Sequence, residues 1–424
     1  MQRQSFLPSS IILFVAILIF EFVPPEIYSF IVIALLSFLV LTTRSSYLFF
    51  WQNPVVPLLL VFVVGLAFAL TNPLDGMLKD LWYILKPVSI ICLGMLFALT
   101  LKSTAGWIKV SAFAIIIVSI VNIYLTLTSG DATGDSPEIQ TRAISFLAAF
   151  LAPFVYRFYP SSSPRGTLIK FLAVTLVGAL IFLSESRAAL LTFGIGWLAA
   201  YGTLQKSSRS LIVFGLIIFA IVVFFPMLPQ YDFQGQRYLA KMQNSINEVM
   251  FEAGTSRIDM YRNWRGFEAY RAYTMWADAP FLKQLFGFGH GSEIQLGKLV
   301  TFNEEDVDSL HSIHNSYFGL LVKTGLFGLA AFLMFMIRPL MQNTGQQDDS
   351  LELYSRLIRG GAVALLLTSA LISGPLNKTN LDALLFIWSI AYGVVLYKQR
   401  SLLPRKAVSQ DRGERRLTGL ASAQ

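Results

Sequence analysis

Long, uninterrupted blocks of apolar residues constrain this sequence more than any other feature. Twelve such blocks follow one another, each close to the roughly 20 residues that a helix needs to cross about 30 Å of hydrocarbon. A soluble fold mixes polar residues into its helices, because most of them bury only one face. Only 14% of the residues are charged, compared with about 25% in an ordinary soluble domain. The sequence therefore predicts an all-α, polytopic integral membrane protein with about twelve transmembrane helices.

The predicted spans follow directly from the apolar blocks. They are residues 8–23, 27–42, 55–70, 81–100, 107–128, 143–159, 168–184, 188–204, 210–228, 316–337, 357–373 and 381–397. The first block resembles a signal peptide. The residues from Glu21 to Pro25 follow it where a small-x-small cleavage site would stand, so we expect a retained span.

The basic residues predict the orientation of these spans. An even number of spans puts both termini on one side, and cytoplasmic loops are enriched in lysine and arginine. The basic residues on the side of the termini are Arg3, Arg44, Lys102, Lys109, Arg157, Arg165, Lys170, Lys206, Arg209, Arg338, Arg356, Arg359 and those of the C-terminal tail, whereas the short loops opposite carry Lys79, Arg142, Arg187 and Lys378. Both termini are therefore expected inside. Because the net charge of +8 is distributed in this way, we expect no nucleic-acid partner.

One connection is unlike the others. Residues 229–315 contain no apolar span, and the charge distribution places them outside. Connections of this length are usually functional or disordered. Ser256 and Asp259 form a capping pair, and Arg257, Arg265 and interleaved apolar residues recur at helical spacing, which favours order. The predicted organisation is 1–228 with nine spans, 229–315 as a partly helical periplasmic loop domain, 316–398 with three spans, and 399–424 as a basic cytoplasmic tail.

All three histidines of the chain, His290, His311 and His314, lie near the end of this loop. Histidine is the side chain best suited to move a proton near neutral pH. The alternative is that an external loop simply tolerates polar residues. A zinc site would need three converging ligands, and no cysteine or His-Glu-x-x-His pattern supports one. We therefore expect no metal and no other cofactor.

Two arginines are placed where they could bind a phosphate. Arg187 joins two spans with almost no loop, beside the first turn of the next helix, and Arg257 starts the predicted loop helix. A guanidinium near a helix N-terminus favours a phosphate oxyanion. The alternatives are an interface arginine paired with Glu185 and, for Arg257, a solvated helix-surface arginine. Arg262 and Arg265 are weaker candidates, because a helix with mixed charges is usually a solvated face.

The glycine-rich segment from Leu285 to Gly291 resembles a nucleotide-binding loop only superficially. It does not follow a strand in a βαβ unit, so a dinucleotide-binding function is not supported. We expect a flexible turn that returns the loop to the membrane.

Four motifs resemble one known family. The segment from His314 to Gly328, HNSYFGLLVKTGLFG, is similar to the His-Asn-x-(Tyr/Phe) and Gly-Leu-x-Gly signature of the O-antigen ligase and polymerase superfamily. Ser186-Arg187-Ala188 resembles its Ser-Arg-(Gly/Ala) motif. Thr255-Ser256-Arg257 and Gly287-Phe288-Gly289 resemble its two loop motifs. The resemblance covers roughly residues 180–328, with the motifs in the family's order, and the N-terminal half is similar only in hydropathy.

The resemblance implies a membrane fold of the glycosyltransferase C type (GT-C-like) in the bacterial inner membrane, with its active site facing the periplasm. It implies a metal-independent enzyme that takes a glycan from undecaprenyl diphosphate. The acceptor would be lipid A-core for a ligase, or the growing glycan for a polymerase. His314 would be the catalytic base, while Arg187 and Arg257 would bind the diphosphate and stabilise the charge on its departure. The expected substrate contacts are Arg262, Arg265, His311, Asn315 and Tyr317.

Three alternatives to the ligase stay open. A polymerase shares every motif above, and the ligase is favoured because a single arginine-led helical loop is similar to the ligase pattern. A twelve-helix transporter or flippase would explain Lys86-Pro87 within a span, but transporters usually show repeats and several ionisable residues at the midplane. A periplasmic metal-dependent hydrolase would need the three histidines to converge.

Overall fold

The computed structural model describes residues 9–42, 54–99, 104–128, 145–184, 186–204, 264–302, 305–341, 349–371, 374–376 and 381–398. The helices before the external loop are α1 (Ser9–Phe22), α2 (Pro25–Thr42), α3 (Val55–Ala67), α4 (Leu74–Ala98), α5 (Thr104–Thr128), α7 (Phe146–Phe158), α8 (Pro164–Leu183) and α9 (Arg187–Ala200). The later elements are α13 (Trp264–Ala277), α14 (Phe281–Phe286), β1 (Ile294–Phe302), β2 (Glu305–Leu310), α15 (Ser316–Ile337), the 3-10 helix η3 (Arg338–Met341), α16 (Asp349–Leu371) and a helix at 382–398. The helical class is confirmed.

Eleven of the predicted spans coincide with these helices, and the span at 210–228 lies outside the described residues. The largest differences are at two helix starts. α4 begins at Leu74 where a span from 81 is predicted, and α16 begins at Asp349 where one from 357 is predicted. Hydropathy places the start of a span after the last charge, but charged residues are tolerated in the first turns of a helix, where the negative ones also favour the helix dipole.

Within the described part of the chain, four helices are long and apolar enough to cross a membrane: Leu74–Ala98, Gly106–Thr128, Pro164–Leu183 and Ser316–Met341. Several shorter apolar helices accompany them. The protein is therefore a helical membrane protein, and the total of twelve spans and the four-part organisation stay predictions.

Serine side chains cap the starts of three helices. Ser145, Ser163 and Ser186 precede α7, α8 and α9, and each hydroxyl accepts a hydrogen bond from the N–H three residues on, at 3.0–3.2 Å. Such caps satisfy N–H groups that have no partner inside the helix. Pro164 follows Ser163 in the first turn of α8, where a missing N–H costs nothing.

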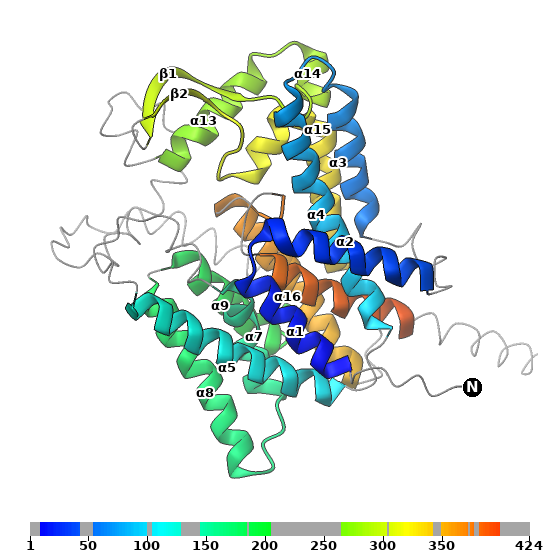
Figure 1. The fold of residues 1–424 in the computed structure, drawn as a ribbon, viewed down its shortest axis with the longest axis vertical. Coiled ribbons are helices and arrows are strands. Elements are labelled where there is room, and N and C mark those ends of the chain that lie inside the picture. The colour runs from blue at the N-terminus through cyan, green and yellow to red at the C-terminus, as the bar shows by residue number, and fades with distance from the viewer. Residues whose placement is uncertain are drawn as a thin grey trace, which may run out of the picture.

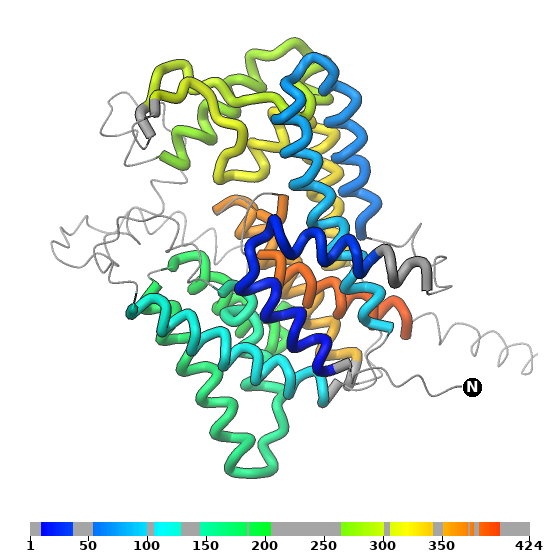
Figure 2. The backbone as a smooth tube through the Cα atoms, in the orientation of Figure 1, coloured from blue at the N-terminus to red at the C-terminus, as the bar shows by residue number. Residues whose placement is uncertain are grey.

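The helices form two groups (Figure 1). α3, α14 and α13 pack against α15 in the upper group, which also holds both strands, while α7, α8 and α9 pack together with α5 and α16 in the lower group. α4 starts in the upper group and runs toward the lower one. The tube in Figure 2 shows that the chain from α13 to the start of α15 stays in the upper group. The region that carries the histidines is thus one spatial unit.

The helix at 382–398 forms the centre of the core. Nearly all of its side chains are buried, among them Phe386, Trp388 and Tyr392 at 1% exposure or less. A helix that is apolar all round is expected to be surrounded by other helices. The indole N–H of Trp388 donates to the carbonyl of Ile358 at 2.9 Å, which joins this helix to α16.

Strands β1 and β2 were not predicted. They form an antiparallel hairpin in which Ile294 pairs with Leu310 and Phe302 pairs with Glu305. Ile294, Leu296 and Val300 of β1 are buried at 1% exposure or less. The pairing register shifts between Gln295 and Val300, at a β-bulge or a similar irregularity of the ladder. This irregularity hides the strand pattern in the sequence, and the expected partly helical loop domain is in fact helical and stranded.

Candidate functional site

A break in α15 prepares the site. Gly325 has a φ of +61° inside this helix, so the regular backbone pattern stops there. An interruption of this kind leaves the carbonyls of the preceding turn short of helical partners. The carbonyls of Val322 and Lys323 accept hydrogen bonds from the N–H groups of Phe288 at 2.8 Å and Gly289 at 3.0 Å. The glycine-rich turn after α14 therefore satisfies buried backbone groups of α15.

Glycine is required in this turn for both conformation and space. Gly287 and Gly289 have φ values of +80° and +88°, which L side chains rarely adopt. A Cβ at Gly287 would lie 2.4 Å from the carbonyl carbon of Lys323, and one at Gly289 would lie 2.2 Å from the carbonyl oxygen of Phe68. The predicted turn is present, but it is held between α3 and α15 by backbone hydrogen bonds and close packing, which a flexible turn would lack.

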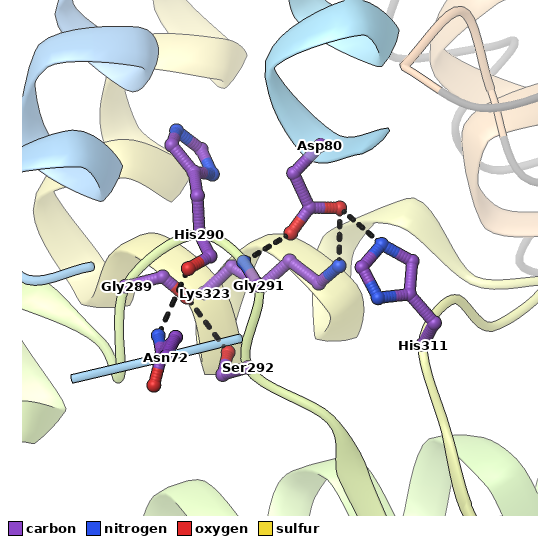
Figure 3. A network of polar contacts seen from close by, with 8 residues as sticks. All are labelled: Asn72, Asp80, Gly289, His290, Gly291, Ser292, His311 and Lys323. Carbon is purple, nitrogen blue, oxygen red and sulfur yellow. Dashed lines mark hydrogen bonds and ion pairs between the residues drawn. The ribbon is translucent and has the colours of Figure 1, made fainter. Parts of the chain in front are cut away.

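Asp80 of α4 joins four parts of the chain (Figure 3). Its carboxylate accepts from the N–H of Gly291 at 2.8 Å and from the ammonium of Lys323 at 2.5 Å. Nε2 of His311 lies 2.9 Å from the same carboxylate. The side chains of Asp80, Lys323 and His311 are only 5, 10 and 13% exposed. A buried charge needs such partners to offset its lost hydration, so Asp80 fixes α4, the glycine turn, His311 and α15 relative to one another.

His290 is buried against α3, where its ring packs on Gly65. Its main-chain N–H donates to the carbonyl of Gly65 at 2.9 Å, and its main-chain carbonyl accepts from the side-chain amide of Asn72 at 2.9 Å. A Cβ on Gly65 would lie 2.2 Å from Nε2 of the imidazole, so only glycine leaves room for the ring. Burial lowers the pKa of His290 below the ordinary histidine value. This histidine has the surroundings of a neutral packing residue.

His314 has a different environment. Its Nδ1 lies 2.9 Å from Oε2 of Glu268, and its main-chain N–H donates to the same oxygen at 3.1 Å. The side chain of Glu268 is 4% exposed, whereas that of His314 is 44% exposed. Within the part of the chain that the structure describes, Nε2 of His314 has no polar partner. His314 therefore has the most exposed side chain of the three histidines, and substrate contacts of His314 and His311 stay predictions.

The three histidines do not converge. His311 contacts Asp80, His314 contacts Glu268, and His290 packs against Gly65. Among the described residues, no group of three or more His, Cys, Asp or Glu side chains is arranged to hold a metal ion. The described side chains therefore do not form the site that a metal-dependent hydrolase would need.

Asn315 and Tyr317 have structural contacts in this arrangement. Asn315 is the N-cap of α15, and its side-chain oxygen accepts from the N–H groups of Tyr317 at 3.0 Å and Phe318 at 3.4 Å. The hydroxyl of Tyr317 donates to the carbonyl of Leu366 in α16 at 2.6 Å. These contacts orient the start of α15, directly after His314. A contact of either residue with a substrate stays a prediction.

The structure describes two of the four candidate arginines, Arg187 and Arg265. Arg187 is half-buried and is the first residue of α9, after the cap Ser186. Arg265 is half-buried near the start of α13, one turn before Glu268. Arg257 and Arg262 lie outside the described residues, as does the capping pair predicted for the loop helix. The roles of all four arginines stay predictions.

Lys86, the feature that motivated a transporter, is paired. Its ammonium lies 2.8 Å from the carboxylate of Asp382, and the two side chains are 1 and 2% exposed. The hydroxyl of Tyr28 donates to the same carboxylate. A buried pair of this kind joins α4 to the central helix at 382–398, which gives Lys86 a structural explanation.

The fold is that of a helical membrane protein. Its site consists of two sets of polar contacts, one around Asp80 between α4 and α15 and one between Glu268 of α13 and His314. Residues 171–333 match the family model described as O-Antigen ligase. This segment runs from α8 into α15 and contains Arg187, Glu268 and all three histidines. The resemblance to the O-antigen ligase and polymerase superfamily is therefore confirmed, and it supports a glycosyltransferase of ligase or polymerase type. A comparison with curated proteins finds no match.

Three residues of the site were not identified as site residues from the sequence. Glu268 stands out there only as one of several positions at helical spacing, and Asp80 is not distinguishable from other charges near span ends. Lys323 lies inside a predicted span, but the sequence does not show which residue it pairs with. Their partners lie 46 residues away for Glu268 and 243 for the pair of Asp80 and Lys323. A single sequence carries no signal for pairs at such separations.

Proposed function

We propose that this protein is an O-antigen ligase-type glycosyltransferase. It moves a glycan from undecaprenyl diphosphate to a sugar hydroxyl of lipid A-core, on the periplasmic face of the bacterial inner membrane. The observation that carries this proposal is the position of His314, half-exposed at the start of α15 inside the segment that matches the family. Its Nδ1 faces a carboxylate, which leaves Nε2 to receive a proton.

In the proposed step, the acceptor hydroxyl oxygen bonds to the anomeric carbon of the donor sugar. Nε2 of His314 takes the hydroxyl proton as this bond forms. The bond from the anomeric carbon to the diphosphate oxygen breaks, and the diphosphate leaves with the electron pair. Arg187 and Arg257 would stabilise that charge, since preorganised donors act most strongly where charge develops. Arg265 and Arg262 are additional candidates for binding the donor.

Paired substitutions of two histidines test the base. His314→Gln removes the half-exposed imidazole, and His311→Gln removes one that is 13% exposed and only three residues away. Positioned general bases contribute about 10²- to 10⁴-fold in rate. We expect a loss in that range for His314→Gln and a loss of less than about tenfold for His311→Gln, measured as transfer from a defined lipid-diphosphate donor. Equal, small losses would show that neither histidine is the base.

A polymerase of the same superfamily is the second candidate, because the family match applies to both types. Deletion of the gene, followed by gel analysis of surface glycan, separates the two. A ligase deletion removes the whole ladder from lipopolysaccharide while lipid-linked polymer accumulates. A polymerase deletion leaves a core that carries a single repeat unit.

A further inference from the structure

We propose that Glu268 is a positioning residue that holds His314 in the tautomer with the proton on Nδ1. The inference rests on the proposed function, since it assigns Glu268 a part in preparing the base for glycan transfer. One oxygen of Glu268 faces both Nδ1 and the main-chain N–H of His314, at 2.9 and 3.1 Å. Two contacts to one residue fix both the position of the backbone and the rotation of the ring.

The carboxylate is held on a rigid element. Glu268 lies in the second turn of α13, next to Phe267 and Ala269, which are 1 and 5% exposed. Phe267 packs with Leu296 and Val300 of β1, and α13 also packs against α15. A group that orients a reacting side chain acts best when its own position is locked by packing. The helix, the hairpin and α15 together supply that support to Glu268.

The chemistry follows from the identity of the partner. An ionised carboxylate can only accept hydrogen bonds, so the Nδ1 that faces it carries the proton of a neutral imidazole. The lone pair is then on Nε2, which faces away from Glu268 and belongs to a side chain that is 44% exposed. The opposite tautomer would present an N–H to the acceptor hydroxyl and could not take its proton. Once Nε2 is protonated, the carboxylate also stabilises the imidazolium.

His311 also has a carboxylate partner, and it shows that such a contact alone does not prepare a histidine to act as a base. His311 meets Asp80 through Nε2, and Asp80 is shared with Lys323 and with the N–H of Gly291. The side chain of His311 is 13% exposed. The arrangement thus gives His311 a structural contact, and it gives His314 a fixed orientation with an accessible nitrogen.

The chain offers a direct measurement, because it contains only three histidines. Selective ¹⁵N-histidine labelling of the full-length protein gives at most three ring patterns in long-range ¹H–¹⁵N spectra, and His314→Gln assigns the one that matters. At about pH 8.5 imidazoles are neutral, and we expect Nδ1 of His314 to be protonated in the wild type. Glu268→Ala should convert this residue to the Nε2-protonated form or to a mixture. Glu268→Gln should keep the Nδ1–H form, because the amide oxygen can accept both N–H groups.

Transfer assays on the same proteins separate positioning from a purely structural role. We expect Glu268→Ala to lower kcat by about 10- to 100-fold with little change in the KM for the donor, and Glu268→Gln to recover part of this loss. Glu293→Gln is the matched control, since Glu293 is an exposed carboxylate of the same loop domain that accepts from Ser309 and, among the described residues, has no hydrogen bond or ion pair with a histidine. It should leave both the spectra and kcat unchanged.

The outcomes for the inference and for the proposed function are distinct. An Nε2-protonated His314 in the wild type, or an unchanged tautomer in Glu268→Ala, would overturn the role of Glu268 whatever the activity. Wild-type kcat in a folded Glu268→Ala protein would do the same. A tautomer that shifts as expected, together with full transfer by His314→Gln, would instead support the positioning by Glu268 and refute His314 as the base.

Discussion

Replacement of Asp80 by asparagine tests how much the contacts of this carboxylate with Gly291, Lys323 and His311 stabilise the protein. Asparagine has nearly the same shape and keeps one oxygen, but it lacks the charge that faces Lys323 at 2.5 Å. The Lys323 side chain is 10% exposed, so its ammonium would lose the charged partner that offsets its lost hydration. Removing one partner of a buried ion pair costs about 3–5 kcal/mol. The decrease in Tm is this free energy divided by the entropy of unfolding, which is about 2 cal/mol/K per residue. For a chain of this length, the expected decrease in Tm is roughly 3–6 °C.

The assay uses the only cysteine of the chain, Cys92, which is 7% exposed in α4. A thiol-reactive dye will label it when the helices separate, so a thermal ramp reports unfolding. Asp75→Asn is the matched control, because Asp75 is an exposed acid in the first turn of the same helix. Its loss should cost less than about 1 kcal/mol.

The double variant Asp80→Asn with Lys323→Met tests whether the unpaired charge of Lys323 causes the decrease in Tm. Replacing both members of a buried pair by uncharged residues is often neutral, so the double variant should recover most of the lost Tm. A Tm for Asp80→Asn within about 1 °C of the wild type would refute the reasoning. So would a double variant that is no more stable than Asp80→Asn alone, because the loss would then not come from the buried charge that Lys323 keeps after its partner is removed.

Three further predictions concern the arginines, the topology and the response to pH. Arg187→Lys and Arg257→Lys should each lower transfer by about a hundredfold, because an ammonium lacks the planar fork that binds two phosphate oxygens; wild-type rates from a folded variant would remove the role assigned to that arginine. Leu299→Cys, at a side chain that is 62% exposed in β1, should react with a membrane-impermeant maleimide in intact spheroplasts, and labelling only after lysis would reverse the predicted orientation. His290 has a lowered pKa when folded, so the unfolded chain binds the extra proton below about pH 6.5 and stability should fall as pH decreases from there. The Tm of His290→Gln should depend less on pH between 7 and 5 than that of the wild type, and equal slopes would contradict this assignment.

The helical membrane class and most helix positions were predictable from the sequence. A helix that crosses a membrane satisfies its own backbone, so its position depends on local composition, and apolar blocks reveal it without knowledge of any neighbour. α15 begins at Ser316 and α9 at Arg187, at or within one residue of the predicted starts. The family motifs also follow the chain order, and the match over residues 171–333 confirms the resemblance to the superfamily.

The contacts that distinguish the histidines were decided only by the tertiary structure. Spacing placed His311 and His314 three residues apart, but it could not show that one faces Asp80 and the other Glu268. The hairpin of β1 and β2 was missed because its register shift disrupts the local alternation, and because the buried face of β1 packs against Phe267 of α13, which is distant in sequence.

The glycine-rich turn shows the same division. Its composition indicated a turn, since glycine alone adopts positive φ at little cost. Its rigidity depends on carbonyls that the break at Gly325 exposes, more than thirty residues further along the chain. Local propensity and hydropathy are properties of neighbouring residues, whereas a hydrogen bond between distant segments exists only after the helices have packed.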